Sequence, residues 1–112
     1  MKYEIIDVGG EKFPIKFGFA ALRHYSNITG TTLADLDKIG NNMTLDDALT
    51  LMYCGIKDGH RVSKQEFDLD IDDIADLLDG NMHCLEKVFE VLGRQMSDGT
   101  EGKQKAKKAK KS

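Results

Sequence analysis

The spacing of apolar residues changes once along the chain, and this change constrains the fold more than any other feature. Over the first 17 residues, apolar side chains recur at every second position, which is the period of a β-strand. Gly9 and Gly10 interrupt this alternation, as a hairpin turn does. From Phe19 the apolar period becomes helical. The sequence therefore predicts a β-hairpin over residues 2–17, followed by a helical part over residues 19–97.

The second strand of this hairpin has one strongly apolar face. Phe13, Ile15 and Phe17 alternate on that face. Pro14 has no N–H group to donate to a neighbouring strand, so it marks this strand as an edge of the sheet. Because two strands alone are only marginally stable, we expect helices to cover the apolar face.

Helical spacing and capping signals follow one another in the next part of the chain. Phe19, Leu22 and Tyr25 share one apolar stripe. Thr32 and Thr44 are each followed three residues later by an aspartate, which is typical of the start of a helix. Together with later signals of the same kind, these features predict four to five helices. The expected fold class is α+β and mainly α.

The middle of the chain carries signals for breaks between helices. Gly59 predicts a loop after the helix that Thr44 opens. Ser63 and Glu66 have the spacing that caps a further single helical turn. Asp70 suits the N-cap of the next helix, because carboxylates follow it in the first turn, where backbone N–H groups favour negative charge.

The acidic segment Asp68–Asp79 also has the carboxylate spacing of a calcium loop, at loop positions 1, 3, 5, 9 and 12. Such a loop needs a glycine at its sixth position and usually a glutamate at its last, where this chain has Asp73 and Asp79. Apolar residues from Ile71 onward recur at helical spacing, and a calcium loop cannot also be that helix. We therefore predict a helix capped by Asp70 and no metal site.

The residues that usually carry chemistry form no known catalytic or metal-binding pattern. Cys54 and Cys84 are too few for a disulfide scaffold, so we expect two reduced, partly buried thiols. Their spacing to His60 and His83 matches no zinc-binding pattern. No nucleophile motif, phosphate-binding loop or dinucleotide fingerprint occurs. The sequence predicts a protein that is not an enzyme and needs no cofactor.

Charge divides the chain into an acidic body and a basic end. Six of the 16 basic residues lie in the last ten positions, which contain no acid: Lys103, Lys105, Lys107, Lys108, Lys110 and Lys111. The rest carries 10 basic and 19 acidic residues, a net charge of −9. We predict one globular domain over residues 1–97 and a disordered lysine-rich tail over residues 98–112. No apolar run is long enough to span a membrane, and without a signal-peptide pattern we expect a cytoplasmic location.

The last helix is expected to carry an apolar seam with alternating spacings of three and four residues, made by Met82, Leu85, Phe89, Leu92 and Met96. Such a seam packs against another helix, in this chain, in a second copy or in a partner protein. Phe and Met are common at adaptable interfaces, so these residues are our candidate partner-binding site. The alternative is that the seam belongs to the core.

The order of these elements resembles that of the tail assembly chaperones of long-tailed bacteriophages and of related proteins from prophages and gene transfer agents. The resemblance covers residues 2–96 and rests on five segments: YEIIDVGGEKFPIKF, GFAALRHY, TLDDALTLMYCGI, FDLDIDDIADLLD and LEKVFEVLGRQM. It implies a non-enzymatic protein of the host cytoplasm that coats the tape measure protein, helps to recruit major tail tube subunits and is absent from the mature virion. The family has no catalytic residues to transfer to this chain.

A different class of protein also fits the charge pattern. A small acidic helical adaptor would use its lysine-rich tail to contact nucleic acid or another polyanion. Lysines alone give phosphate binding that is independent of sequence and sensitive to salt. An acidic body repels phosphates, which disfavours nucleic acid as the partner.

Overall fold

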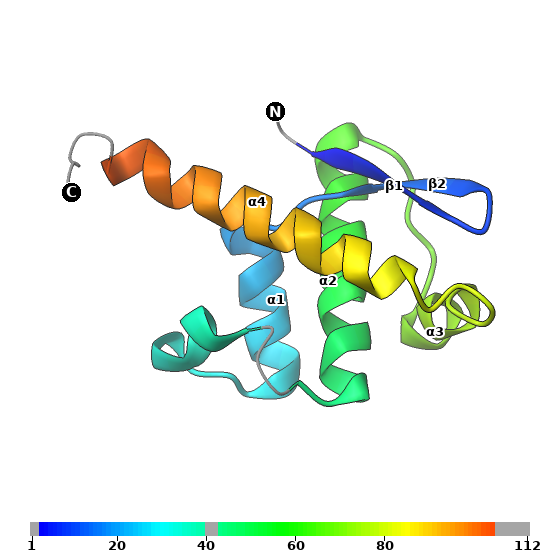
Figure 1. The fold of residues 1–112 in the computed structure, drawn as a ribbon, viewed down its shortest axis with the longest axis horizontal. Helices are drawn as coiled ribbons and strands as arrows, with labels where there is room; N and C mark the ends of the chain where they lie inside the picture. The colour runs from blue at the N-terminus through cyan, green and yellow to red at the C-terminus, as the bar shows by residue number, and fades with distance from the viewer. Residues whose placement is uncertain (1–2, 40–42, 105–112) are drawn as a thin grey trace.

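The computed structural model describes residues 3–39 and 43–104, without the side chains of Asp37 and of residues 97–104. Its elements in chain order are β1 (Glu4–Val8), β2 (Glu11–Ile15), α1 (Phe19–Thr29), the 3₁₀-helix η1 (Leu33–Lys38), α2 (Leu45–Ser63), α3 (Ile71–Leu77) and α4 (Cys84–Gln104). Figure 1 shows α1 and α2 side by side, with α4 running across them and the hairpin at one end. The predicted fold class, a β-hairpin followed by a mainly helical part, is confirmed.

The hairpin forms where the alternation predicted it. β1 and β2 pair antiparallel, with Val8 opposite Glu11 on either side of the turn. Gly9 and Gly10 have φ angles of 64° and 93°, a left-handed conformation that glycine adopts without strain. The apolar face of β2 is buried, so helices cover it as expected.

Gly59 lies inside α2, and the predicted loop at this position is wrong. The residue allows the backbone of α2 to approach β2: a Cβ atom at Gly59 would lie 2.5 Å from the backbone nitrogen of Ile15 and still closer to the carbonyl group of Pro14. One turn earlier, the Gly55 carbonyl accepts a hydrogen bond from the Lys16 N–H at 3.0 Å. The two glycines bring the helix and the hairpin into backbone contact, as small residues do at closely packed helices.

Two of the predicted caps are confirmed; Thr32 precedes η1, but its side chain makes no capping hydrogen bond to the backbone. The Asp47 N–H donates to Oγ1 of Thr44 at 3.0 Å, at the start of α2. At the start of α3, Asp70 and Asp73 form a reciprocal capping box, with both N–H to carboxylate distances at 2.9 Å. The segment Asp68–Asp79 is therefore an extended stretch followed by a helix.

The predicted single turn between Ser63 and Glu66 is wrong. Ser63 is the last residue of α2, and its hydroxyl donates to the His60 carbonyl within that helix. Lys64 ends the helix in a left-handed conformation, with φ at 63°. The Gln65 N–H donates to the His60 carbonyl at 2.9 Å, and residues 65–70 contain no helical turn.

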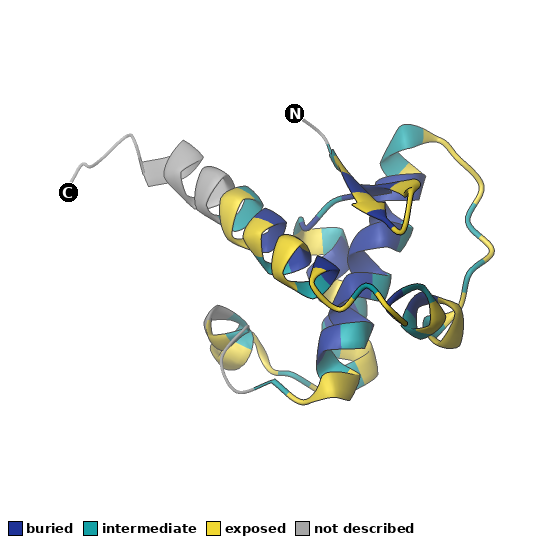
Figure 2. Cartoon of the chain, turned by 45° about the vertical axis from the view of Figure 1, so that its right-hand side comes forward, coloured by how far each residue is buried: buried dark blue, intermediate teal, exposed yellow. Residues whose placement is uncertain are grey.

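The core lies where the hairpin, α2 and the inner face of α4 meet, as the buried residues in Figure 2 show. α4 contributes Cys84, Val88, Val91 and Leu92, at the i, i+4, i+7, i+8 spacing of one helix face. Beside this face, the side chain of Gln95 accepts a hydrogen bond from the Phe17 N–H at 2.6 Å. α4 is thereby attached to the segment that joins the hairpin to α1.

The helix α4 extends to Gln104, beyond the boundary at which we predicted a disordered tail to begin. Once a helix is formed, each added residue costs little, so helical structure can continue past the last buried side chain. The remainder of the predicted tail, residues 105–112, lies outside the described residues. Within the described part of the chain, none of the helices combines the length and apolar character that crossing a membrane requires.

Candidate functional site

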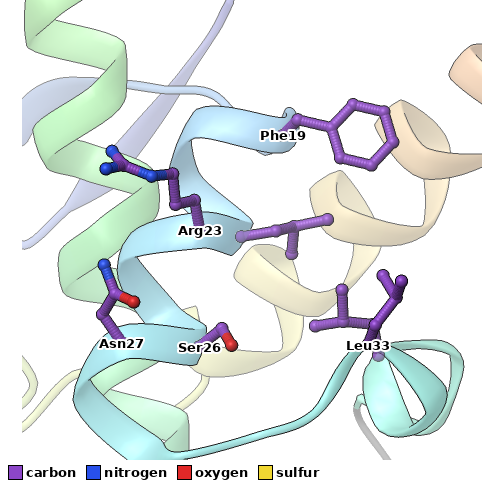
Figure 3. A pocket seen from close by; sticks show the side chains of 7 residues that line it. Phe19, Arg23, Ser26, Asn27 and Leu33 are labelled. Carbon is purple, nitrogen blue, oxygen red and sulfur yellow. The ribbon is translucent and has the colours of Figure 1, made fainter.

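A groove of about 350 Å³ lies between α1 and η1 (Figure 3). Its apolar side is formed by Phe19, Leu22, Leu33 and Leu36. Its polar rim is formed by Arg23, Ser26 and Asn27, on α1. We call this feature the α1/η1 groove.

Two of the large apolar side chains that line the groove are mostly exposed to solvent. Phe19 is 79% exposed and Leu33 is 82% exposed, although each begins a helix of the folded domain. Single exposed apolar residues are common on protein surfaces, and two that line the same groove make it a candidate binding site. Neither side chain contributes its apolar surface to the core.

The three residues of the apolar stripe predicted for α1 do not share one environment in the structure. Leu22 and Tyr25 are 6% and 3% exposed and pack inward, whereas Phe19 does not. Phe19 directly follows the N-cap Gly18, so it belongs to the first turn, at the end of the helix. Helical spacing alone cannot show where the neighbouring element ends, and here the covering surface stops before Phe19.

Hydrogen bonds within the turn after α1 fix the position of η1. The Gly30 N–H donates to the Ser26 carbonyl at 2.8 Å, with Gly30 in a left-handed conformation. The Thr29 hydroxyl donates to the Tyr25 carbonyl at 2.8 Å and accepts from the Thr31 N–H at 3.2 Å. Because these bonds lock the chain between the two helices, the walls of the α1/η1 groove are held in place without a ligand.

The partner-binding residues predicted on the last helix occupy three different environments. Leu92 is 5% exposed and lies in the core. The next three, Leu85, Phe89 and Met96, are half-buried and pack against the core from one flank of α4. Met82 precedes α4 and is 67% exposed. The binding role of this set stays a prediction, and the structure leaves Met82 and the half-buried flank as its accessible part.

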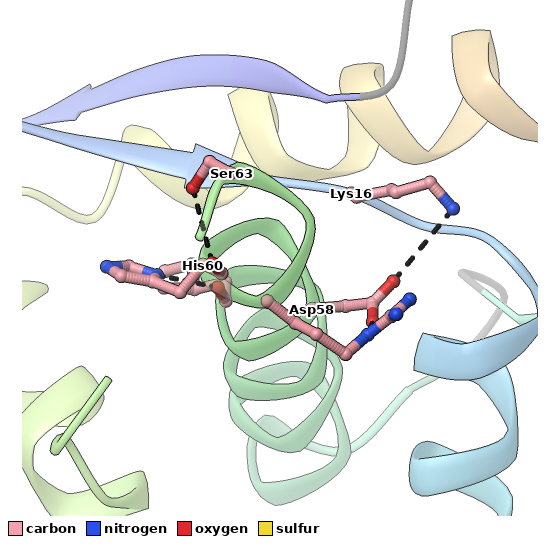
Figure 4. A network of polar contacts seen from close by, with 6 residues as sticks. Lys16, Asp58, His60 and Ser63 are labelled. Carbon is pink, nitrogen blue, oxygen red and sulfur yellow. Dashed lines mark hydrogen bonds and ion pairs between the residues drawn. The ribbon is translucent and has the colours of Figure 1, made fainter. Parts of the chain in front are cut away.

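A second set of polar residues surrounds a buried carboxylate near the end of α2 (Figure 4). Asp58 is 2% exposed, and its Oδ1 accepts a hydrogen bond from Nε of Arg61 at 2.6 Å. Its Oδ2 lies 4.0 Å from Nζ of Lys16. The hydrogen bond to Asp58 raises the pKa of the Arg61 guanidinium, which stays charged. Sequence reasoning missed this cluster, because Lys16 directly follows β2 while Asp58 and Arg61 lie in α2, and together they follow no motif.

The histidine next to this cluster has a structural environment. His60 is buried, and its Nδ1 lies 2.8 Å from the Ile56 carbonyl one turn earlier, a distance at which Nδ1–H donates. Its ring packs against that of Phe67, with the ring centres 5.1 Å apart. These contacts orient the ring within the core.

Both cysteines are free and buried, as predicted. Burial raises the pKa of the Cys54 thiol to about 11. The Cys84 thiol donates a weak hydrogen bond to the Asp7 carbonyl at 3.5 Å, which links α4 to β1. Over the described residues, His, Cys, Asp and Glu side chains nowhere gather in threes around a position that could hold a metal ion.

Comparisons of the chain with protein-family models, with curated proteins and with solved structures found no match.

Proposed function

We propose that this chain is a non-enzymatic assembly chaperone of the kind that long-tailed bacteriophages use for their tails. It binds apolar helical segments of a tape measure protein in the host cytoplasm, helps to recruit tail tube subunits, and is absent from the mature virion. The α1/η1 groove is the observation that supports this proposal best.

The apolar lining of the groove suits a helix from a partner. Amphipathic helices bind in apolar grooves through side chains at i, i+3, i+4 and i+7. Phe19 and Leu33 offer exposed apolar contacts on the two walls, with Leu22 and Leu36 between them. Binding an apolar stripe here would remove both exposed side chains from water, which favours association.

The charge of the chain suits the same task. Residues 1–102 carry a net charge of −9, so complexes coated with this protein repel one another. A long apolar helix covered in this way would stay in solution, which is the requirement for a chaperone of the tape measure protein. The exposed apolar groove provides the attraction, and the acidic surface provides solubility.

The test is to co-express the full chain with a tape measure fragment that aggregates when it is expressed alone. Wild-type protein is expected to keep the fragment soluble and to co-purify with it. The variant Leu33→Asp places a charge in the groove, and because Leu33 is 82% exposed the variant should fold and lose this activity.

Leu45→Asp is the matched control. Leu45 is 64% exposed, at the first position of α2 and outside the residues that line the groove. The same substitution there should leave fragment solubility unchanged. Met82→Asp tests the accessible part of the predicted set on α4 in the same assay. Wild-type protein that neither co-purifies with the fragment nor reduces its aggregation would refute the chaperone function.

A further inference from the structure

A second pocket, of about 220 Å³, opens between α1 and the last turns of α2, and two cationic side chains line it. It is lined by His24, Lys57, Asp58, Arg61, Gln65 and Phe67. Two of these residues carry a positive charge, and the single carboxylate among them is buried. A concentration of cations is unexpected on a body whose net charge is −9.

The buried carboxylate of Asp58 positions Arg61, one of the two cations of this pocket. Its side chain is 1% exposed, and removing a charge from water carries a large cost unless partners compensate it. Oδ1 is bound by Arg61, whereas Oδ2 accepts no hydrogen bond from the described residues and has only the Lys16 ammonium, at 4.0 Å. The pairing is incomplete, so a purely stabilising role does not account for it. Buried polar atoms without a hydrogen-bond partner are rare in native structures, and each calls for an explanation beyond packing.

Arg61 uses only one nitrogen of its guanidinium to bind Asp58. Nε is bound to Asp58, while the Nη groups make no hydrogen bond within the described part of the chain, and 60% of the side chain is exposed. A guanidinium fixed in this way presents a planar fork that binds carboxylates with two parallel hydrogen bonds. Lys57, held over the ring of Tyr53 at 5.8 Å, and the imidazole of His24 supply further donors around the same pocket.

We propose that this pocket binds a side-chain carboxylate from an acidic peptide segment. Arg61 would bind the carboxylate through its Nη groups, Lys57 would add a second charge, and Asp58 would act as a positioning residue for Arg61. A nucleic acid fits less well, because it carries a charge at every nucleotide, whereas a peptide can place its carboxylates at the pocket and neutral residues beside the acidic body. The pocket shares no lining residue with the α1/η1 groove, so this proposal is independent of the chaperone function.

The experiment titrates the ¹⁵N-labelled full chain with a hexapeptide that has two aspartates between pairs of asparagines, and follows the backbone amide shifts. Lysines in the C-terminal segment would also attract an acidic peptide, so all samples carry glutamine at the five lysines between positions 105 and 111. The expected result is saturable shifts centred on His24, Lys57 and Arg61. A hexa-asparagine peptide should cause none.

Lys57→Gln is the decisive variant, because Lys57 does not pair with Asp58 and its loss should leave the fold intact. We expect its affinity for the peptide to fall about fivefold or more, in line with the loss of one charge-assisted contact. Lys87→Gln removes the same charge from an exposed position on α4 and should bind like the parent chain. Arg61→Lys, which keeps the charge and loses the planar fork, should weaken binding as well.

Three results would overturn the proposal. The first is the absence of saturable shifts at the pocket. The second is an equal loss of affinity in Lys57→Gln and Lys87→Gln, which would indicate general charge attraction. The third is tighter binding of a single-stranded oligonucleotide than of the peptide at the same residues, which would identify a phosphate site.

Discussion

Gly59→Ala tests the close contact between α2 and β2, on which the architecture depends. The added Cβ would lie 2.5 Å from the backbone nitrogen of Ile15 and closer to the carbonyl of Pro14. Both colliding groups belong to the backbone of β2, so no side-chain rotation relieves the contact. The helix and the strand must separate, which disturbs the packing of the buried residue Ile15.

The magnitude follows from two opposing terms. Replacing glycine by alanine inside a helix normally stabilises it by about 1 kcal/mol. Overpacking a closed interface costs roughly 1–3 kcal/mol, and a clash with backbone atoms belongs at the upper end of this range. We therefore expect Gly59→Ala to lower the free energy of unfolding by about 2 kcal/mol, despite the better helix propensity of alanine.

The assay is urea denaturation followed by circular dichroism, with Gly93→Ala as the matched control. Gly93 lies in α4, and beyond its chain neighbours and the nearby backbone of its own helix, a Cβ there would meet no atom within 4 Å. The control should gain about 0.5–1 kcal/mol from helix propensity alone, so the two variants should shift in opposite directions. A Gly59→Ala protein that is as stable as the wild type would refute the backbone contact.

Two further predictions concern the acidic helix start and the buried thiol. Asp70→Ala should lower the free energy of unfolding by about 1 kcal/mol through loss of the capping box, whereas Asp76→Ala, exposed on the same helix, should not. Addition of calcium should leave the melting temperature unchanged in both variants and in the wild type, and a calcium-dependent rise that Asp70→Ala abolishes would contradict this. The pKa of Cys54 is raised from 9.0 to about 11, so above pH 9 the unfolded chain releases this proton first and stability should fall up to about pH 11. Cys54→Ala should show a smaller loss over the same range, and equal slopes would contradict the assignment.

Local signals in the sequence predicted the parts of the fold that depend on local interactions. The turn at Gly9 and Gly10 and the caps at Thr44 and Asp70 each involve residues within a few positions of one another. The loop predicted at Gly59 was wrong because the role of this glycine depends on Pro14, which is far away in the sequence. A glycine that permits close approach and a glycine that ends a helix have the same appearance in a single sequence.

The candidate binding surfaces were less predictable than the fold, for a related reason. Periodicity identifies apolar stripes but not which part of a stripe a neighbour covers, so Phe19 was grouped with Leu22 and the seam on α4 was grouped with Leu92. The exposure of Leu33 depends on where η1 is held against α1. The pocket beside Asp58 is lined by residues of both α1 and α2, which are separated in the sequence. A buried carboxylate on a helix gives no signal of its own in a sequence.

The most direct measurement of the proposed function is a titration of the ¹⁵N-labelled full chain with a purified, soluble helical segment of a tape measure protein, read as backbone amide shifts. The chaperone account predicts saturable shifts that centre on Phe19, Leu33 and Leu36, on the walls of the α1/η1 groove. Leu33→Asp should abolish them, while Leu45→Asp should leave them unchanged. Absence of saturable shifts with the wild-type chain, or shifts in Leu33→Asp equal to those of the wild type, would contradict the account.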